Sequence, residues 1–201
     1  MSEPMIARCP WPGIADPEYA RYHDEEWGVP LTGDRALFEK LVLEGFQSGL
    51  SWLTILKKRD NFRRAFHDFD AARIAKYGAH DIERLMGDAG IVRNKLKIES
   101  TIDNAKAILA LSKRTPLSHF IWGFVGAPQQ NQITSMAGAP AQTELSKKIS
   151  KALKAEGFRF VGPTTVYAFM QSSGMVNDHF VTCPRFTACA KLQKKLKVPG
   201  R

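Results

Sequence analysis

The sequence predicts an all-α protein, and three observations lead to this prediction. Apolar residues recur with the period of helices along most of the 201 residues, helix-starting residues precede these segments, and strand signals are nearly absent. No internal repeat and no Pro-, Gly- or Ser-rich linker divides the chain. With 44% hydrophobic residues, the chain can form a single helical domain over residues 1–190, or two lobes around a cleft.

The expected helices are mostly preceded by a residue that starts helices well. Asp and Ser side chains accept hydrogen bonds from the free amides of a first turn, and proline is preset for the first helical position. The polar stretch 126–142 is predicted to be a loop, and the lysine-rich residues 191–201 a flexible basic tail. Helices are predicted over residues 17–27 after Asp16, 35–48 after Asp34, 52–66 after Ser51, a short segment after Asp70, and 80–86, 93–113, 116–125, 143–156 and 163–173.

Charge and targeting features narrow the class of protein. A formal net charge of +9 favours a polyanionic partner such as nucleic acid, although a merely soluble basic protein explains it about equally well. No segment approaches the run of about 20 apolar residues that spans a membrane, and residues 1–8 lack the apolar stretch of a secretory signal. The sequence therefore predicts a cytosolic (cytoplasmic) protein that folds without an obligate protein partner.

The cysteines and histidines indicate a candidate metal site. Three cysteines are an odd number for a disulfide framework in a reducing compartment. Cys9 and His23 lie near one end of the chain and His179 and Cys183 near the other, and four such ligands fill a tetrahedral Zn²⁺ shell. If the second pair is helical, its i, i+4 spacing places both side chains on one face. Spacing alone still favours the alternative of a core histidine and inert buried thiols, and Cys189 is expected to be a free thiol.

Residues 85–95, with the sequence LMGDAGIVRNK, form a glycine-containing connection between two expected helices. The glycines permit a tight turn, and a helix that starts at about Arg93 directs its free N–H groups into that turn, where a phosphate oxygen can bind. Gly90, Arg93 and Lys95 are therefore candidate DNA-binding residues. The connection resembles the helix-hairpin-helix element of DNA repair proteins, but an ordinary turn between helices explains it about as well.

A third group of residues is aromatic and acidic. Tyr19, Tyr22 and Trp27 belong to the first expected helix, and Glu44 and Trp52 lie further along the chain. Core packing explains several of the aromatic residues without any function. Glu44 is harder to explain in this way, because it stands in an apolar run where an unpaired carboxylate is costly to bury. A carboxylate among aromatic faces can hold a flat cationic heterocycle.

Together these residues resemble the type I 3-methyladenine DNA glycosylase family, over nearly the whole chain from Arg8 to Cys183. Many matching motifs occur in the same order, which no single short motif could explain. The motifs are Arg8-Cys9, residues 22–30 (YHDEEWGVP), Leu43-Glu44-Gly45, Gly49-Leu50-Ser51-Trp52, Asp88-Ala89-Gly90-Ile91, Phe160-Val161-Gly162 and Val176-Asn177-Asp178-His179.

The resemblance implies an all-α helix-hairpin-helix glycosylase fold, with one structural zinc ion that joins the N- and C-terminal segments. The implied ligands are Cys9, His23, His179 and Cys183. The implied activity is hydrolysis of the N-glycosidic bond of 3-methyladenine in alkylated double-stranded DNA, with 3-methyladenine as product. Neither an activating Asp nor an attacking Lys stands at a matching place after the hairpin, so the implied reaction is monofunctional.

The resemblance also assigns roles to individual residues of the implied site. Glu44 and Tyr22 contact the edge of the flipped base, and Trp52 stacks on it with help from Trp27 and Tyr19. Gly49 and Leu50 stand where the family enters the gap left by the extruded nucleotide.

Three other functions are less consistent with these residues. A non-catalytic zinc-stabilised DNA-binding protein would gain nothing from Glu44 among aromatic residues, because a surface that binds phosphates does not use a carboxylate. A zinc hydrolase needs an open coordination position, which four protein ligands would close. An iron–sulfur glycosylase needs a fourth cysteine, and the chain has three.

Overall fold

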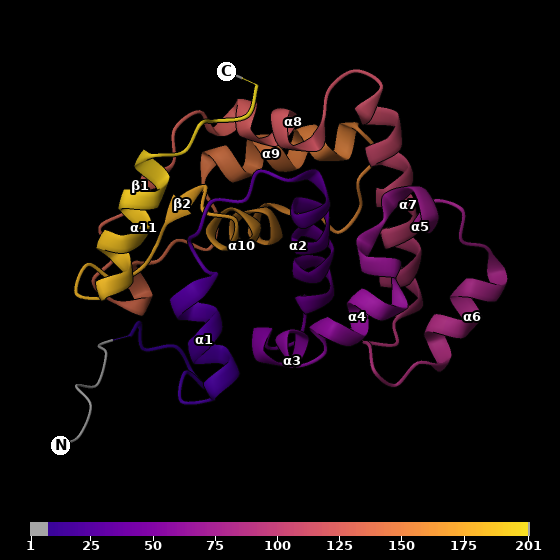
Figure 1. Ribbon diagram of the computed structural model, residues 1–201, viewed down its shortest axis with the longest axis horizontal. Helices are drawn as coiled ribbons and strands as arrows, with labels where there is room; N and C mark the ends of the chain where they lie inside the picture. Colours follow the sequence, from indigo (N-terminus) through magenta and orange to yellow (C-terminus); the bar gives the residue numbers. More distant parts are fainter. Residues whose placement is uncertain (1–7, 201) are drawn as a thin grey trace.

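The computed structural model describes residues 8–200 and confirms the predicted all-α fold (Figure 1). Residues 1–7 and 201, which the sequence prediction assigns to the domain and to the tail, lie outside the described residues. The helices are α1 (Pro17–Glu25), α2 (Asp34–Gln47), α3 (Trp52–Leu56), α4 (Arg59–Ala65), α5 (Ala71–Ile74), α6 (Ala79–Gly87), α7 (Lys95–Ser112), α8 (Leu117–Val125), α9 (Glu144–Ala155), α10 (Pro163–Ser172) and α11 (Pro184–Lys194), with 3₁₀ turns at His67–Phe69 and Met136–Gly138 and the strands β1 (Gln129–Gln130) and β2 (Val176–Asn177).

Three of the four helix-starting residues named from the sequence are confirmed as side-chain caps. Asp16, Ser51 and Asp70 each accept a hydrogen bond from the first turn of the helix that follows. Asp34 is the exception, because it is the first residue of α2 and its side chain does not cap that helix. Its carboxylate instead accepts from the backbone amide of Ser118 at 2.8 Å, so it caps α8 in space.

Two predicted helix boundaries are wrong. The segment expected as one helix after Ser51 is divided into α3 and α4, because the chain tightens at its middle, where the Lys58 amide donates to the Ile55 carbonyl. The helix after the hairpin begins at Lys95 rather than at Arg93. Asn94 fixes this start, since its side chain accepts from the amide of the first turn at 3.1 Å.

The C-terminal residues differ from the expected flexible tail. Helix α11 extends beyond residue 190, and the half-buried Leu196 and Val198 pack against the main core. Gln193 is buried and donates to the Gly28 carbonyl at 2.9 Å. The buried positions of this segment include Cys189 and a polar glutamine between exposed lysines, so an apolar period was not visible in the sequence.

Helix α2 is the central helix of the fold. It packs against α3, α7, α8 and α10, and nine of its residues are buried: Leu37, Phe38, Lys40, Leu41, Val42, Leu43, Glu44, Gly45 and Phe46. Most buried apolar residues form one core around it. A second, smaller cluster consists of Tyr22, Trp27 and Leu56, with three half-buried aromatic residues against it, Trp11, Tyr19 and Trp52. This aromatic cluster lies apart from the main core and forms one side of the site described below.

The first and last helices lie on the same side of the molecule. Figure 1 shows α1, in indigo, and α11, in yellow, at the left of the view, with α4 to α7 at the right. Strand β1 pairs with β2 in parallel, which holds the segment after α8 against the segment before α11. No helix among residues 8–200 is both long enough and apolar enough to cross a bilayer.

Candidate base pocket and metal centre

A cavity of about 270 Å³ opens beside the aromatic cluster, between α1, α2 and α10. Its volume lies near the lower end of the range for ligand pockets, which suits one small ring system rather than a large ligand. Its wall contains all five residues that the sequence singled out for base binding. The lining residues are Trp11, Pro12, Tyr19, Tyr22, Trp27, Glu44, Gln47, Trp52, Met136, Ala139, Ala168, Gln171, Asp178 and Phe180.

The aromatic residues of the wall contact one another as a continuous set. Tyr19 and Tyr22 lie one turn apart on α1 with nearly parallel rings, and the Tyr22 ring centroid is 5.4 Å from that of Trp52 at the start of α3. The sequence did not indicate Trp11 as a site residue. Its ring lies edge-on to the ring of Trp27, with 4.7 Å between the two ring centroids. Adjacent rings of this kind hold one another in place and leave flat apolar faces toward the cavity.

Glu44 is the buried acid of this pocket. It lies on α2, is 5% exposed, and is flanked by buried apolar residues. Burial raises the pKa of the Glu44 carboxyl from its ordinary value to about 7, and Lys40 and then the Ser172 hydroxyl offset part of this effect. Burial and then the charge of Glu44 raise the pKa of Tyr22 well above its ordinary value, so its hydroxyl stays protonated and can donate. Glu44 and Tyr22 therefore place an acceptor and a donor beside the aromatic faces of the pocket.

A second acid in the wall, Asp178, was not predicted as a pocket residue. Its carboxylate accepts from the Tyr167 hydroxyl and from the side-chain amides of Asn131 and Gln171, at 2.6–2.7 Å. These three donors fix the carboxylate at the back of the pocket. Tyr167 and Gln171 lie one turn apart on α10, whereas Asn131 follows β1 far earlier in the chain, so spacing along the sequence gave no signal for this network.

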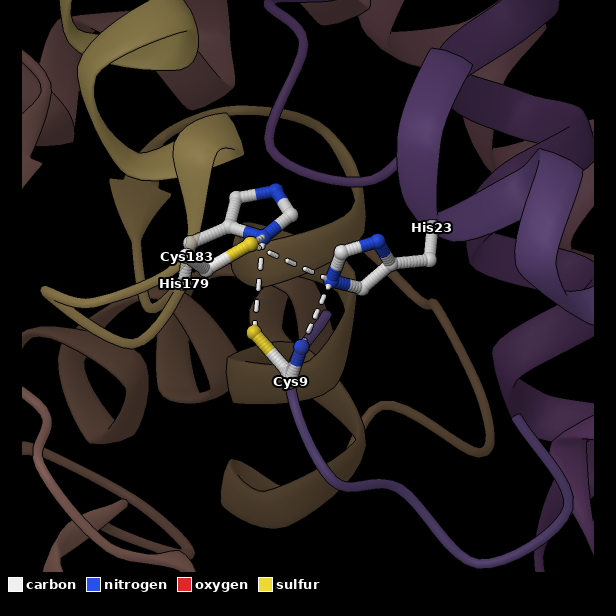
Figure 2. Close-up of side chains that lie close together, drawn as sticks. All are labelled: Cys9, His23, His179 and Cys183. Carbon is white, nitrogen blue, oxygen red and sulfur yellow. Dashed lines mark hydrogen bonds between the residues drawn. The ribbon is translucent and has the colours of Figure 1, made fainter. Parts of the chain in front are cut away.

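The four predicted metal ligands lie together, all of them buried (Figure 2). Their ligand atoms are all within 4.8 Å of one another. Cys9 Sγ is 3.6 Å from His179 Nδ1, and Cys183 Sγ is 3.8 Å from His23 Nε2. Zinc–sulfur and zinc–nitrogen bonds in a tetrahedron separate S and N atoms by about 3.6 Å. The donor set and its spacing therefore fit a tetrahedral ion held by four protein ligands.

Neighbouring groups orient both histidines of this centre. His23 Nδ1 is 2.8 Å from the Asp24 carboxylate, which Arg8 also holds, and this leaves His23 Nε2 for a metal. His179 Nε2 is 3.0 Å from the Trp27 carbonyl, which leaves His179 Nδ1. Such hydrogen bonds on the far ring nitrogen are typical of metal-binding histidines. The condition that His179 and Cys183 share a helical turn is not met, because these residues form a non-helical turn and Cys183 precedes α11.

The two thiols influence one another strongly. The contact with Cys9, and then contacts with His179 and His23, lower the pKa of the Cys183 thiol. The same contact between the thiols, and then burial, raise the pKa of Cys9. Cys183 therefore loses its proton more readily than Cys9, and a divalent cation displaces the protons from both thiols. Cys189 is buried and stands outside this group of ligands.

The predicted wedge residues form an exposed turn at the end of α2. Gly49 has φ of +81°, a left-handed conformation that glycine adopts easily, and Leu50 is 39% exposed. The buried Lys97 ammonium, from the first turn of α7, donates to the carbonyls of Phe46 and Ser48 at 2.8 and 2.6 Å. Lys97 was not predicted as a site residue, and it fixes the C-terminal end of α2 where the turn begins.

The predicted hairpin is present between α6 and α7, as Figure 1 shows at the right of the view. A Cβ at Gly90 would lie 2.9 Å from the Asp88 carboxylate and 3.1 Å from Asn61 of α4, so a larger residue there requires these neighbours to shift. Arg93 and Lys95 are exposed on the connection and at the first residue of α7. Lys58 donates to the Ala89 carbonyl at 2.8 Å, which ties the hairpin to the start of α4. None of the three predicted hairpin residues lines the aromatic pocket.

The chain is similar to known proteins over most of its length. A family model described as methyladenine glycosylase matches residues 11–186. A DNA-3-methyladenine glycosylase of Haemophilus influenzae is 50% identical over 182 residues, which cover 90% of this chain and 98% of that protein. A crystal structure of 3-methyladenine DNA glycosylase I superposes with a TM-score of 0.86 at 49% identity, and covers 88% of this chain and 98% of the other. A structure of a variant of 3-methyladenine DNA glycosylase I in complex with 3-methyladenine superposes with a TM-score of 0.81 at 38% identity, over 84% and 92% of the two chains.

Proposed function

The chain belongs to the methyladenine glycosylase family, and from that premise we propose that it hydrolyses the N-glycosidic bond of 3-methyladenine in alkylated double-stranded DNA. The observation that carries this function is the buried Glu44 carboxyl in a small aromatic cavity. A flat ring enters between aromatic faces, and only a base taken out of the DNA stack can reach such a cavity. The reaction belongs to base-excision repair, and its products are free 3-methyladenine and an abasic site.

In the proposed complex, Glu44 and Tyr22 contact the edge of the flipped base. Methylation at N3 makes the adenine ring cationic, so the Glu44 carboxylate attracts it in addition to accepting from the exocyclic amine. Trp52, Trp27 and Tyr19 supply stacking faces, which also attract a cation. A normal adenine offers the hydrogen bond without the charge, and the pocket therefore favours the damaged base.

The chemical step asks little of the protein, because the base is already a good leaving group. When the bond between the sugar and the base breaks, its electron pair neutralises the ring and positive charge develops on the sugar, which a water molecule then attacks. The attraction of Glu44 for the ring is therefore largest before bond cleavage. Its contribution belongs to recognition of the flipped base, and it appears in kcat/KM more than in kcat.

The proposed DNA contacts lie on the exposed turn and on the hairpin. Leu50, next to the left-handed Gly49, supplies an apolar side chain that can enter the gap left by the flipped nucleotide. Gly90, Arg93 and Lys95 supply close backbone approach and positive charge for phosphate oxygens. Lys97 and Lys58 hold these two segments in place through backbone carbonyls, as described above.

We also propose that the metal centre holds one structural Zn²⁺ ion. Two thiolates and two imidazoles are the ligand set that zinc prefers, and the four protein ligands close its coordination shell. Such an ion supplies no activated water. Its role is to connect the segment before α1 and α1 itself to the turn before α11.

The function is tested by identifying the base released from methylated DNA. Incubation of the purified protein with DNA treated with a methylating agent should release 3-methyladenine and leave abasic sites, both measured against the spontaneous loss of bases. A protein that binds this DNA and releases no base would contradict the glycosylase assignment. It would instead favour the non-catalytic DNA-binding function.

Replacing Arg93 with alanine should weaken DNA binding by a similar factor for every sequence, because Arg93 is expected to contact phosphate and not a base edge. Binding of the wild type should fall linearly on a plot of log affinity against log salt concentration, and the variant should lose about one unit of that slope. Fluorescence anisotropy with a labelled duplex measures both. A flat salt dependence of the wild type would indicate that the positive charge serves solubility only.

A further inference from the structure

Lys40 is a buried cation behind the base pocket that neither the sequence nor the proposed reaction accounts for. It lies one turn before Glu44 on α2 and is 7% exposed. Its ammonium is 4.9 Å from the centroid of the Tyr22 ring and 5.4 Å from that of the Trp52 ring. Both rings line the base pocket, whereas Lys40 lines a second cavity of about 210 Å³ that neither ring lines. The two rings therefore stand between Lys40 and the base pocket.

The charge of Lys40 is not used by an ion pair. Among residues 8–200, no carboxylate lies within ion-pair distance of its ammonium, and the two acids nearest to it along the wall of the second cavity are already paired. Glu26 pairs with Arg59, and Glu39 pairs with Arg63 at 2.8 Å. A buried, unpaired ammonium is costly unless nearby charge or ring faces compensate it. Here the compensation available is the Glu44 carboxylate and the two aromatic faces.

We propose that Lys40 is a positioning residue of the base pocket, whose ammonium keeps the Glu44 carboxylate charged at neutral pH and thereby sets the preference of the pocket for a cationic base. This inference rests on the proposed function, because it requires that the charge of Glu44 recognises the base. Lys40 itself touches no base. It acts through the ionisation of Glu44 from the far side of the rings.

The charged and polar groups around Lys40 and Glu44 support this effect and determine its direction. Burial raises the pKa of Glu44 to about 7, and Lys40 is the largest influence in the opposite direction. A carboxyl with a pKa near 7 is about half ionised at neutral pH, so any loss of nearby positive charge makes it mostly neutral. Four charged groups face Lys40: Glu44 and Glu39 of α2, Glu26 after α1 and Arg59 of α4. The groups that face Glu44 are Lys40, the Ser172 hydroxyl of α10, and Tyr19 and Tyr22 of α1.

Lys40 also has an unfavourable effect, which makes the test sharper. A cation on the outer faces of Tyr22 and Trp52 weakens the attraction of their inner faces for a cationic base. At neutral pH the ionisation of Glu44 outweighs this loss. At alkaline pH Glu44 is ionised with or without Lys40, so the favourable effect is lost; burial also lowers the pKa of Lys40, and the unfavourable effect fades as its ammonium loses its proton. The benefit of Lys40 should therefore disappear as pH rises.

The experiment compares pH profiles of kcat/KM on a duplex with 3-methyladenine for the wild type, Lys40→Met, Lys40→Gln and Glu44→Gln. The positive charge of the base is fixed by methylation, so kcat/KM reports groups of the free enzyme. The kcat/KM of the wild type should rise with pH through a midpoint near 7, because the active form of the enzyme carries the ionised Glu44 carboxylate. In both Lys40 variants the midpoint should move to higher pH by about one unit or more. Their kcat/KM at pH 7 should be about fivefold lower, and should equal or exceed the wild type above pH 9.

Controls separate the possible failures. Lys106→Met removes an exposed lysine on α7 and should leave the midpoint unchanged, which excludes an effect of net charge alone. Melting temperatures confirm that each variant is folded, and a merely structural Lys40 would lower stability without moving the midpoint. The midpoint could stay unmoved in both folded Lys40 variants while the rise of kcat/KM with pH is absent from Glu44→Gln. That result would overturn the role of Lys40 and leave that of Glu44 intact. If kcat/KM still rises with pH in Glu44→Gln, or does not rise in the wild type, the roles of both Lys40 and Glu44 are overturned.

Discussion

Replacing Glu44 with glutamine should lower kcat/KM for excision of 3-methyladenine by about ten- to a hundredfold, with a smaller change in kcat. Glutamine keeps the size of the side chain and one hydrogen bond but removes the charge. A hydrogen bond to a charged group contributes roughly 1.5–3 kcal/mol, which corresponds to this range of rates. Excision of a neutral base, where it is measurable, should change less, so the ratio of the two rates reports the electrostatic part of recognition.

The stability of the Glu44→Gln protein distinguishes a recognition role from a structural one. Burial raises the pKa of Glu44 to about 7, so the site favours the neutral form, and the ionised carboxylate costs stability as pH rises through that value. The variant should thus melt no lower than the wild type at pH 8. If Glu44 were a structural carboxylate, glutamine would lower the melting temperature first and leave excision by the folded protein largely intact.

A matched control uses another glutamate of the same helix. Glu39 is half-buried on α2 and pairs with Arg63, and it does not line the base pocket. Glu39→Gln should leave excision near the wild-type rate. Binding of free 3-methyladenine and the excision rate should be measured on the same preparation of each variant. If both remain at the wild-type level in folded Glu44→Gln protein, Glu44 is not part of the site.

Local features of the fold were predictable because they depend on neighbouring residues alone. Asp16, Ser51 and Asp70 cap the helices that follow them, and α10 lies within the helix predicted over residues 163–173. Features that depend on distant residues were not visible. Asp34 caps a helix that lies far along the chain, and α11 packs through a stripe that includes the polar Gln193. A sequence pattern records neither kind of contact.

The same distinction between local features and contacts of distant residues applies to the candidate site. Glu44 could be noticed because a carboxylate interrupts an apolar run, and the structure places it in a cavity with the aromatic residues named beside it. Asp178 and Lys40 gave no such signal. Asp178 is held by two donors of α10 and by Asn131 after β1, and Lys40 looks like the exposed lysine of an amphipathic helix until its neighbours are known. Their environments arise only when α1, α2 and α10 are assembled.

The metal centre and the base pocket share the segment around α1. His23 follows Tyr22 directly on this helix, and the His179 ring packs edge-on against Trp27, whose carbonyl lies 3.0 Å from His179 Nε2. Tyr22 and Trp27 both line the base pocket. An ion at this centre would therefore hold one wall of the pocket while it contacts neither the base nor the reacting sugar.

Replacing Cys183 with serine should lower the zinc content and reduce the melting temperature by roughly 10–20 °C. The ion would close a loop between residues 9 and 183, and cross-links over loops of this size stabilise a protein by about 4–5 kcal/mol. Each kcal/mol corresponds to about 2–4 °C for a chain of this length. Zinc is measured by elemental analysis of protein purified without chelators, and unfolding by calorimetry.

Cys189 provides a matched control for the Cys183 variant, because it is an equally buried free thiol outside the four ligands. Cys189→Ser should keep a full complement of zinc and lose less stability, since it removes one buried contact and no ligand. Protein of the Cys183→Ser variant that remains folded should still release 3-methyladenine, because the ion has no open position for an activated water. Absence of zinc from the wild type, or a wild-type melting temperature in Cys183→Ser, would contradict the proposed centre. Complete loss of excision by folded Cys183→Ser protein would instead show that the base pocket needs the ion, either for its shape or for the reaction.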